Sequence, residues 1–168
     1  MSKLALVTFK IYLDEFSFLG FEHVVTENSD FGKFWDVFFK NGGYKKITPK
    51  AIPPKLDTNV WHTNDKGEKI YFQGKIVGNV KNAPENHSYK TFPACEYLVV
   101  THEWLPTFKE AQKYGIDAGW ENMKTVPMPE GYVKDDGITT PITVIERDNK
   151  NTPDGSRIEF WVPIRKKK

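Results

Sequence analysis

The sequence is poor in the features that define several large classes of protein. Its 168 residues include one cysteine, Cys95, so an internal disulfide cannot form. No segment approaches the ~20 apolar residues of a membrane-spanning helix, and Lys3, Lys10 and Asp14 interrupt the N-terminal stretch where a signal peptide needs a continuous apolar core. These absences favour one domain in a reducing, cytoplasmic compartment, away from membranes, with Cys95 as a small buried apolar side chain.

A large excess of either charge is also missing. The chain has 24 Lys and Arg residues against 22 Asp and Glu residues, a formal net charge of +2, and so weak a field gives no general attraction to nucleic acid or anionic lipid. Motifs for phosphate loops, nucleophile elbows, paired-cysteine metal sites and zinc proteases are absent. The histidines, His23, His62, His87 and His102, have no metal-ligand spacing. The sequence therefore predicts neither a cofactor nor a metal site.

The chain does contain clear periodic segments. Apolar alternation typical of strands occurs at residues 4–13, 18–25, 59–64, 68–80, 92–103, 142–148 and 158–165. Helical spacing follows Ser29, a predicted N-cap, and follows Thr107, where Glu110 completes a capping-box pattern and the helix is expected to run to about Met123. The Lys- and Pro-rich residues 44–58 and the Pro- and Gly-rich residues 127–137 are predicted loops.

The order of these segments predicts an internal duplication. Each half reads strand, helix, strand, strand, with pseudo-repeats at about residues 4–82 and 90–165. We therefore expect a single α+β domain over residues 1–168, in which two small sheets join edge to edge under two helices. The expected sheet is antiparallel and curved, with both helices on one face.

Aromatic residues, 14% of the chain, cluster around carboxylates on the predicted strands. In residues 158–164 the alternation places Glu159 and Trp161 on one face and apolar side chains on the other. The strands at residues 59–64 and 68–80 are predicted to form a hairpin that turns at residues 64–67, where Asn, Asp and Gly occur. On its second strand, Ile70, Phe72 and Ile76 are assigned to the helix-covered face. Tyr71 and Trp61 are then expected on the opposite face of the sheet, together with Glu159 and Trp161.

Such a face suits a flat, lipophilic organic cation. Aromatic rings bind a cation by apolar burial and by cation–π attraction, and a partly buried carboxylate supplies the opposite charge and has a raised pKa. The alternative is structural: Trp61, Tyr71 and Trp161 are ordinary half-buried strand residues, and Glu159 pairs with a lysine. Periodicity leaves both interpretations open.

Five short segments in the second half resemble a known family. They are residues 92–94, 97–100, 129–132, 145–148 and 158–164, which read FPA, YLVV, PEGY, IERD and IEFWVPI. Together and in this order they are similar to the GyrI-like small-molecule-binding domain, which also forms the effector-binding half of multidrug-sensing transcription regulators. The resemblance implies duplicated β-α-β-β halves, a ligand cleft on the sheet face opposite the helices, and hydrophobic, often cationic, ligands.

The resemblance also implies site residues. Two glutamates of the family match Glu146 and Glu159, and two aromatic positions match Trp120 and Tyr132, although the loop before Tyr132 is longer than usual. The chain departs from the pattern at Asp148, where the family usually has an aromatic residue two positions after the first glutamate, and Cys95 replaces a usual glycine. The regulators carry an upstream DNA-binding domain, whereas here the ligand domain begins within ten residues, so a stand-alone form without direct DNA binding is expected.

Three functions remain compatible with the sequence. The first is a binding module whose cleft, lined by Trp61, Tyr71, Trp120, Tyr132 and Trp161, takes a lipophilic cation between Glu146 and Glu159. The second is a hydrolase of strained, cyclopropane-type natural products, in which the paired glutamates position and deprotonate a water. The third is an interaction protein that docks an unidentified protein partner through a sheet edge. The binding module is the interpretation we carry forward.

Overall fold

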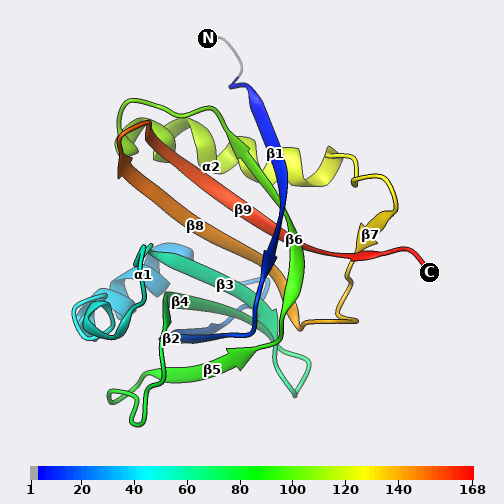
Figure 1. The fold of residues 1–168 in the computed structure, drawn as a ribbon. Coiled ribbons are helices and arrows are strands. Elements are labelled where there is room, and N and C mark those ends of the chain that lie inside the picture. Colours follow the sequence, from blue (N-terminus) through cyan, green and yellow to red (C-terminus); the bar gives the residue numbers. More distant parts are fainter. Residues whose placement is uncertain (1–3) are drawn as a thin grey trace.

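The computed structural model describes residues 4–168, which form nine strands, two α-helices and one 3-10 turn (Figure 1). The strands are β1 Leu6–Leu13, β2 Phe16–Val24, β3 Thr58–Thr63, β4 Lys69–Val77, β5 Ser88–Phe92, β6 Cys95–His102, β7 Tyr132–Lys134, β8 Ile142–Thr152 and β9 Gly155–Lys166. The helices are α1 Phe31–Lys40 and α2 Phe108–Thr125, and the 3-10 turn is Thr48–Lys50. No helix among residues 4–168 has both the length and the apolar character needed to cross a bilayer.

All described strands belong to one antiparallel sheet, in the order β1-β6-β9-β8-β3-β4-β2-β5, with β7 paired to β9. The β3–β8 pair joins the two halves of the chain edge to edge, and the predicted α+β class is confirmed. On either side of that pair the order is mirrored, since β9 corresponds to β4 and β6 to β2. The arrangement agrees with the expected duplication, which stays a prediction.

The sheet is curved, and both helices lie on one of its faces (Figure 1). The opposite face encloses a core. The enclosed core contains Phe18, Phe72, Tyr97, Ile145 and Trp161, drawn from strands of both halves. On the helix side, α2 packs on β6, β8 and β9, and α1 packs on β2 and β4. The two helices therefore stand beside one another on one face, as predicted, and leave a space between them.

The predicted faces of the hairpin are inverted in the structure. Ile70 and Phe72 belong to the enclosed core, whereas Tyr71 contacts Phe31 of α1 with ring centroids 5.4 Å apart. Alternation along a strand shows which residues share a face, but it does not show which face a helix covers. The expectation that Ile70, Phe72 and Ile76 lie under a helix is therefore wrong.

The helix starts follow ordinary capping chemistry. Helix α2 begins after Thr107, whose hydroxyl accepts from the Glu110 backbone N–H at 3.2 Å, so the predicted N-terminus is confirmed. The Glu110 carboxylate accepts from the Thr107 hydroxyl at 2.9 Å, in place of the backbone N–H that a capping box uses. Helix α1 is capped by Asp30, which accepts from the Lys33 N–H, and not by Ser29. Ser29 instead accepts from the Thr26 N–H in the preceding turn.

Two predicted loops contain more structure than their composition indicates. Within residues 44–58, Ile47 is fully buried beside α1, although the Lys- and Pro-rich composition of the segment predicted a loop. Within residues 127–137, the short strand β7 pairs with β9. In both places tertiary contacts with a neighbouring element compensate for weak local propensity. Cys95 is buried, as predicted, and burial raises the pKa of its thiol to about 11.

Candidate functional site

A cavity of about 430 Å³ opens between α1 and α2, with the sheet as its floor. We call it the aromatic cleft. Its lining residues are Phe31 and Trp35 from α1, Asn59 and Trp61 from β3, Tyr71 from β4, Gln112, Ile116 and Trp120 from α2, Glu146 and Asp148 from β8, and Ile158 from β9. A cleft between the two halves was expected, but its position was wrong: it lies on the helix-bearing face, because the opposite face is filled by the enclosed core.

Aromatic rings form the walls of this cleft. The Trp61 ring is the common neighbour of three others, with centroid distances of 4.7 Å to Tyr71, 5.4 Å to Phe31 and 5.6 Å to Trp120. The interplanar angles of 44–83° are typical of tilted and edge-to-face packing. These rings come from both halves of the chain and line one cavity.

Glu146 lies at the floor of the cleft, opposite Asn59 on the neighbouring strand. The Trp61 indole N–H donates to its carboxylate at 2.6 Å. Desolvation raises the pKa of Glu146 to about 7, and hydrogen bonds from Trp61 and Asn59 limit the rise. A carboxyl group in this environment gains strongly from a cation placed beside it.

Asp148 is a second carboxylate in the same cleft, which sequence reasoning treated as a departure from the family pattern. It is two residues from Glu146 on β8, so both side chains project from one face of the strand. Burial, and next the negative charge of Asp57, raise the pKa of Asp148 to about 6, while Lys150 opposes the rise. Its even spacing from Glu146 on a predicted strand is the sequence signal that could have identified this residue.

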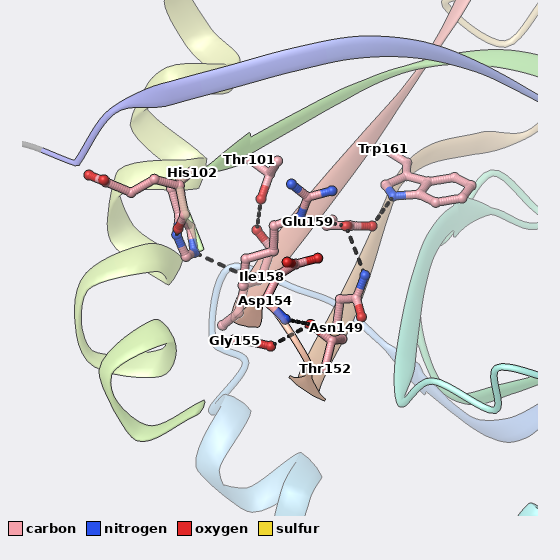
Figure 2. A network of polar contacts seen from close by, with 11 residues as sticks. Thr101, His102, Asn149, Thr152, Asp154, Gly155, Ile158, Glu159 and Trp161 are labelled. Atoms are coloured by element: carbon pink, nitrogen blue, oxygen red, sulfur yellow. Dashed lines mark hydrogen bonds and ion pairs between the residues drawn. The ribbon is translucent and has the colours of Figure 1, made fainter. Parts of the chain in front are cut away.

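Glu159 lies on the other face of the sheet, away from the cleft. Its cross-strand partner is Arg147, whereas the partner of Glu146 is Phe160. Cross-strand partners share a face of the sheet and consecutive residues point to opposite faces, so Glu159 and Glu146 lie on opposite faces. Figure 2 shows the Glu159 carboxylate accepting from Asn149 and from the Trp161 indole. The Arg157 guanidinium lies 2.9 Å from the same carboxylate. Glu159 and Trp161 therefore belong to a buried structural network, and the expected glutamate pair does not exist.

We expect the change Glu159→Gln to destabilise the fold. Glu159 is 4% exposed. Its carboxylate forms an ion pair with the Arg157 guanidinium, and its negative charge also favours the charged form of the buried Arg147. Glutamine keeps the acceptor but not the charge that these two nearly buried cations require, so the expected cost is about 2 kcal/mol in the free energy of unfolding. Urea denaturation of the variant and the wild type at pH 7 measures the difference, and unchanged stability would contradict this structural role.

Tyr132 also lies outside the aromatic cleft. Its hydroxyl donates to the Glu96 carboxylate at 3.2 Å, and the Lys10 ammonium lies 4.4 Å from its ring centroid. Of the residues that the sequence singled out, the structure thus brings together Trp61, Tyr71, Trp120 and Glu146, and it separates Glu159, Trp161 and Tyr132 from them. The cleft residues on the helices, Phe31, Trp35, Gln112 and Ile116, were missed because helical periodicity does not distinguish core from cleft.

A larger hollow of about 800 Å³ lies on the other side of Trp120. Its walls combine the positive charges of Lys124 and Lys134 with the negative charges of Asp65 and Asp136, and it has no cluster of rings. Such mixed charges neutralise one another. Within residues 4–168 no group of three or more His, Cys, Asp or Glu side chains is arranged to hold a metal ion. The aromatic cleft, which combines rings with carboxylates, is the better candidate site.

A model of a known protein family matches this chain. A family model named Cass2 and described as an integron-associated effector binding protein matches residues 11–164, nearly the whole chain. No curated protein sequence matches significantly. The match agrees with the resemblance drawn from the five segments of the second half.

Solved structures share the fold at low sequence identity. SAV2435, solved with tetraphenylphosphonium bound, superposes with a TM-score of 0.66 at 13% identity and covers 95% of this chain and 94% of its own. An integron cassette protein from the mobile metagenome of Vibrio cholerae gives 0.56 at 11% identity, covering 98% and 100%. The C-terminal domain of EcmrR gives 0.56 at 16% identity, covering 96% and 99%. Similarity at this level shows a common fold.

Proposed function

The chain belongs to the family of integron-associated effector binding proteins, and from this premise we propose that its aromatic cleft binds a lipophilic organic cation, with Glu146 as the counter-charge. The observation that carries the proposal is the composition of the cleft. Two carboxylates with raised pKa values lie among five aromatic rings, and the lining residues include no Lys, Arg or His. A bound cation would supply the positive charge that these walls lack.

Two kinds of interaction favour such a ligand over a neutral one. The rings of Phe31, Trp61, Tyr71 and Trp120 offer apolar contact, and each cation–π contact contributes about 0.5–2 kcal/mol according to how far it is desolvated. The Glu146 carboxylate adds an ionic attraction that is stronger in the cleft than in water, because protein atoms replace most of the solvent around it. A neutral analogue of the same shape gains only the apolar part.

The hydrolase hypothesis loses its geometric basis. It required Glu146 and Glu159 to share one water, and these residues project from opposite faces of the sheet. The buried Glu159 carboxylate is already engaged by Arg157, Asn149 and Trp161. Binding without chemical change of the ligand is the function that the cleft supports best.

A titration of the protein with tetraphenylphosphonium tests the proposal. We expect saturable binding at micromolar concentrations, followed by calorimetry or by the fluorescence of Trp61 and Trp120 at the cleft wall. Neutral triphenylphosphine oxide, which keeps three of the rings, is the matched control and should bind at least tenfold more weakly. Affinity no tighter than millimolar for the cation, or equal affinity for both compounds, would contradict the proposal.

A further inference from the structure

The two carboxylates of the aromatic cleft differ in what they contact. Glu146 accepts from the Trp61 indole at 2.6 Å. In the part of the chain that the structure describes, the Asp148 carboxylate has no hydrogen-bond donor and no ion pair, although Asp148 is half-buried and lines the cleft. Both Asp148 oxygens are therefore available to accept hydrogen bonds from a group that enters the cleft.

The positive charges nearest to Asp148 are already engaged by another residue. Lys150 lies 2.7 Å and Lys75 lies 3.0 Å from the two carboxylate oxygens of Asp57, which neighbours Asp148 across the β3–β8 junction. Lys75 also donates to the Lys55 carbonyl at 2.8 Å. Both lysines are therefore held by Asp57 and do not neutralise Asp148 by direct contact.

The spacing of the two carboxylates determines how far apart two nitrogen donors of a ligand would have to lie. Residues i and i+2 of a strand lie on one face with Cα atoms about 6.8 Å apart. Glu146 and Asp148 have this relation on β8, and both line the cleft. Two nitrogen donors joined by a short chain can span a separation of this order and give each carboxylate its own donor.

We propose that the aromatic cleft selects cations with N–H donors at two points, a diamine attached to an apolar ring system, with Glu146 binding one nitrogen and Asp148 the other. The proposal rests on the proposed function and deepens it, because it names the class of cation. The remaining lining groups fit this occupant: the rings of Trp61 and Trp120 hold the aromatic part, and the side chains of Asn59 and Gln112 carry carbonyl oxygens that can accept further hydrogen bonds.

A pair of matched compounds tests this inference. N-(naphthylmethyl)putrescine carries two ammonium groups, and N-(naphthylmethyl)pentylamine replaces the distal one by a methyl group while keeping the chain length. We expect the wild type to bind the diamine at least tenfold more tightly than the monoamine at pH 8. In Asp148→Asn this preference should fall below threefold, with monoamine affinity changed less than threefold.

Asp154→Asn is the control variant, because it removes the same charge at an exposed turn outside the cleft; it should keep the wild-type preference. Equal affinity of the wild type for the two amines overturns the inference, as does a preference that survives in Asp148→Asn. If Asp148→Asn does not fold, the wild-type ratio decides alone. Failure of the inference with tetraphenylphosphonium still bound leaves the proposed function intact, whereas loss of all binding contradicts the proposed function itself.

Discussion

Replacement of Glu146 by glutamine is expected to weaken the binding of tetraphenylphosphonium by about tenfold to a hundredfold, which corresponds to the removal of one partly desolvated charge contact. Glutamine keeps the shape of the side chain and can still accept from the Trp61 indole. The rings of the cleft therefore remain in place, and the change isolates the ionic part of binding. Calorimetric titration of both proteins at pH 8, where the wild-type carboxyl group is ionised, measures the ratio.

Two controls separate the charge contact from general damage. Affinity for neutral triphenylphosphine oxide should change less than twofold in Glu146→Gln, because that compound has no charge to pair. Glu159→Gln removes the same charge on the opposite face of the sheet, and it should leave the affinity of the folded protein for tetraphenylphosphonium unchanged. A large loss of cation affinity in Glu159→Gln, with none in Glu146→Gln, would reverse the assignment of the site.

The largest expected effect on stability comes from Gly119→Ala in α2. At this position a Cβ atom would overlap the ring of Phe160, a fully buried side chain of β9. The ring cannot move aside within a close-packed core, so α2 must shift away from the sheet, at an expected cost of about 3 kcal/mol despite the better helix propensity of alanine. Urea denaturation measures the loss of stability.

The same change should also weaken ligand binding, because Trp120 and Ile116 line the cleft from α2. Asp117→Ala is the matched control: it places alanine at an exposed position of the same helix, and it should alter the free energy of unfolding by less than about 0.5 kcal/mol. A Gly119→Ala variant as stable as the wild type would show that the helix does not depend on this close approach.

The periodic segments predicted the architecture well because strand and helix periods differ strongly. The N-cap at Thr107 correctly predicted the start of α2, and the hairpin between β3 and β4 turns where the sequence predicted. The N-cap of α1 was misplaced by one residue, since both Ser29 and Asp30 are good caps and only the backbone geometry selects Asp30. Gly115 and Gly119 lower the intrinsic helix propensity of α2, and the structure shows that both are positions of close contact with the sheet.

Half of the candidate site could be predicted, and the reason for the other half is geometric. Alternation within β9 correctly placed Glu159 and Trp161 on one face. It does not show which residues of another strand lie on that same face. Trp61 and Tyr71 were therefore joined to the wrong pair, and the true neighbour of Glu146, Asp148, was not selected. The sheet register, which depends on long-range pairing of β3 with β8, decides which carboxylates meet.

The most direct test of a cation bound beside Glu146 is the pH dependence of tetraphenylphosphonium affinity. The ligand is charged at every pH, so any change reports on the protein. Burial raises the pKa of Glu146 to about 7, which means that the carboxyl group is protonated at pH 5 and ionised at pH 8.5. The groups around it are Asp148, with a pKa of about 6, the Asp57 pair with Lys75 and Lys150, and Tyr71, whose pKa is raised by burial beyond this range.

We therefore expect the wild-type affinity to rise at least tenfold between pH 5 and pH 8.5, with the main increase centred near pH 7. In Glu146→Gln the increase near pH 7 should disappear and leave the smaller one near pH 6 that belongs to Asp148. Identical profiles for the two proteins, or an affinity that falls as the pH rises, would contradict the central claim that the ionised Glu146 holds the cation.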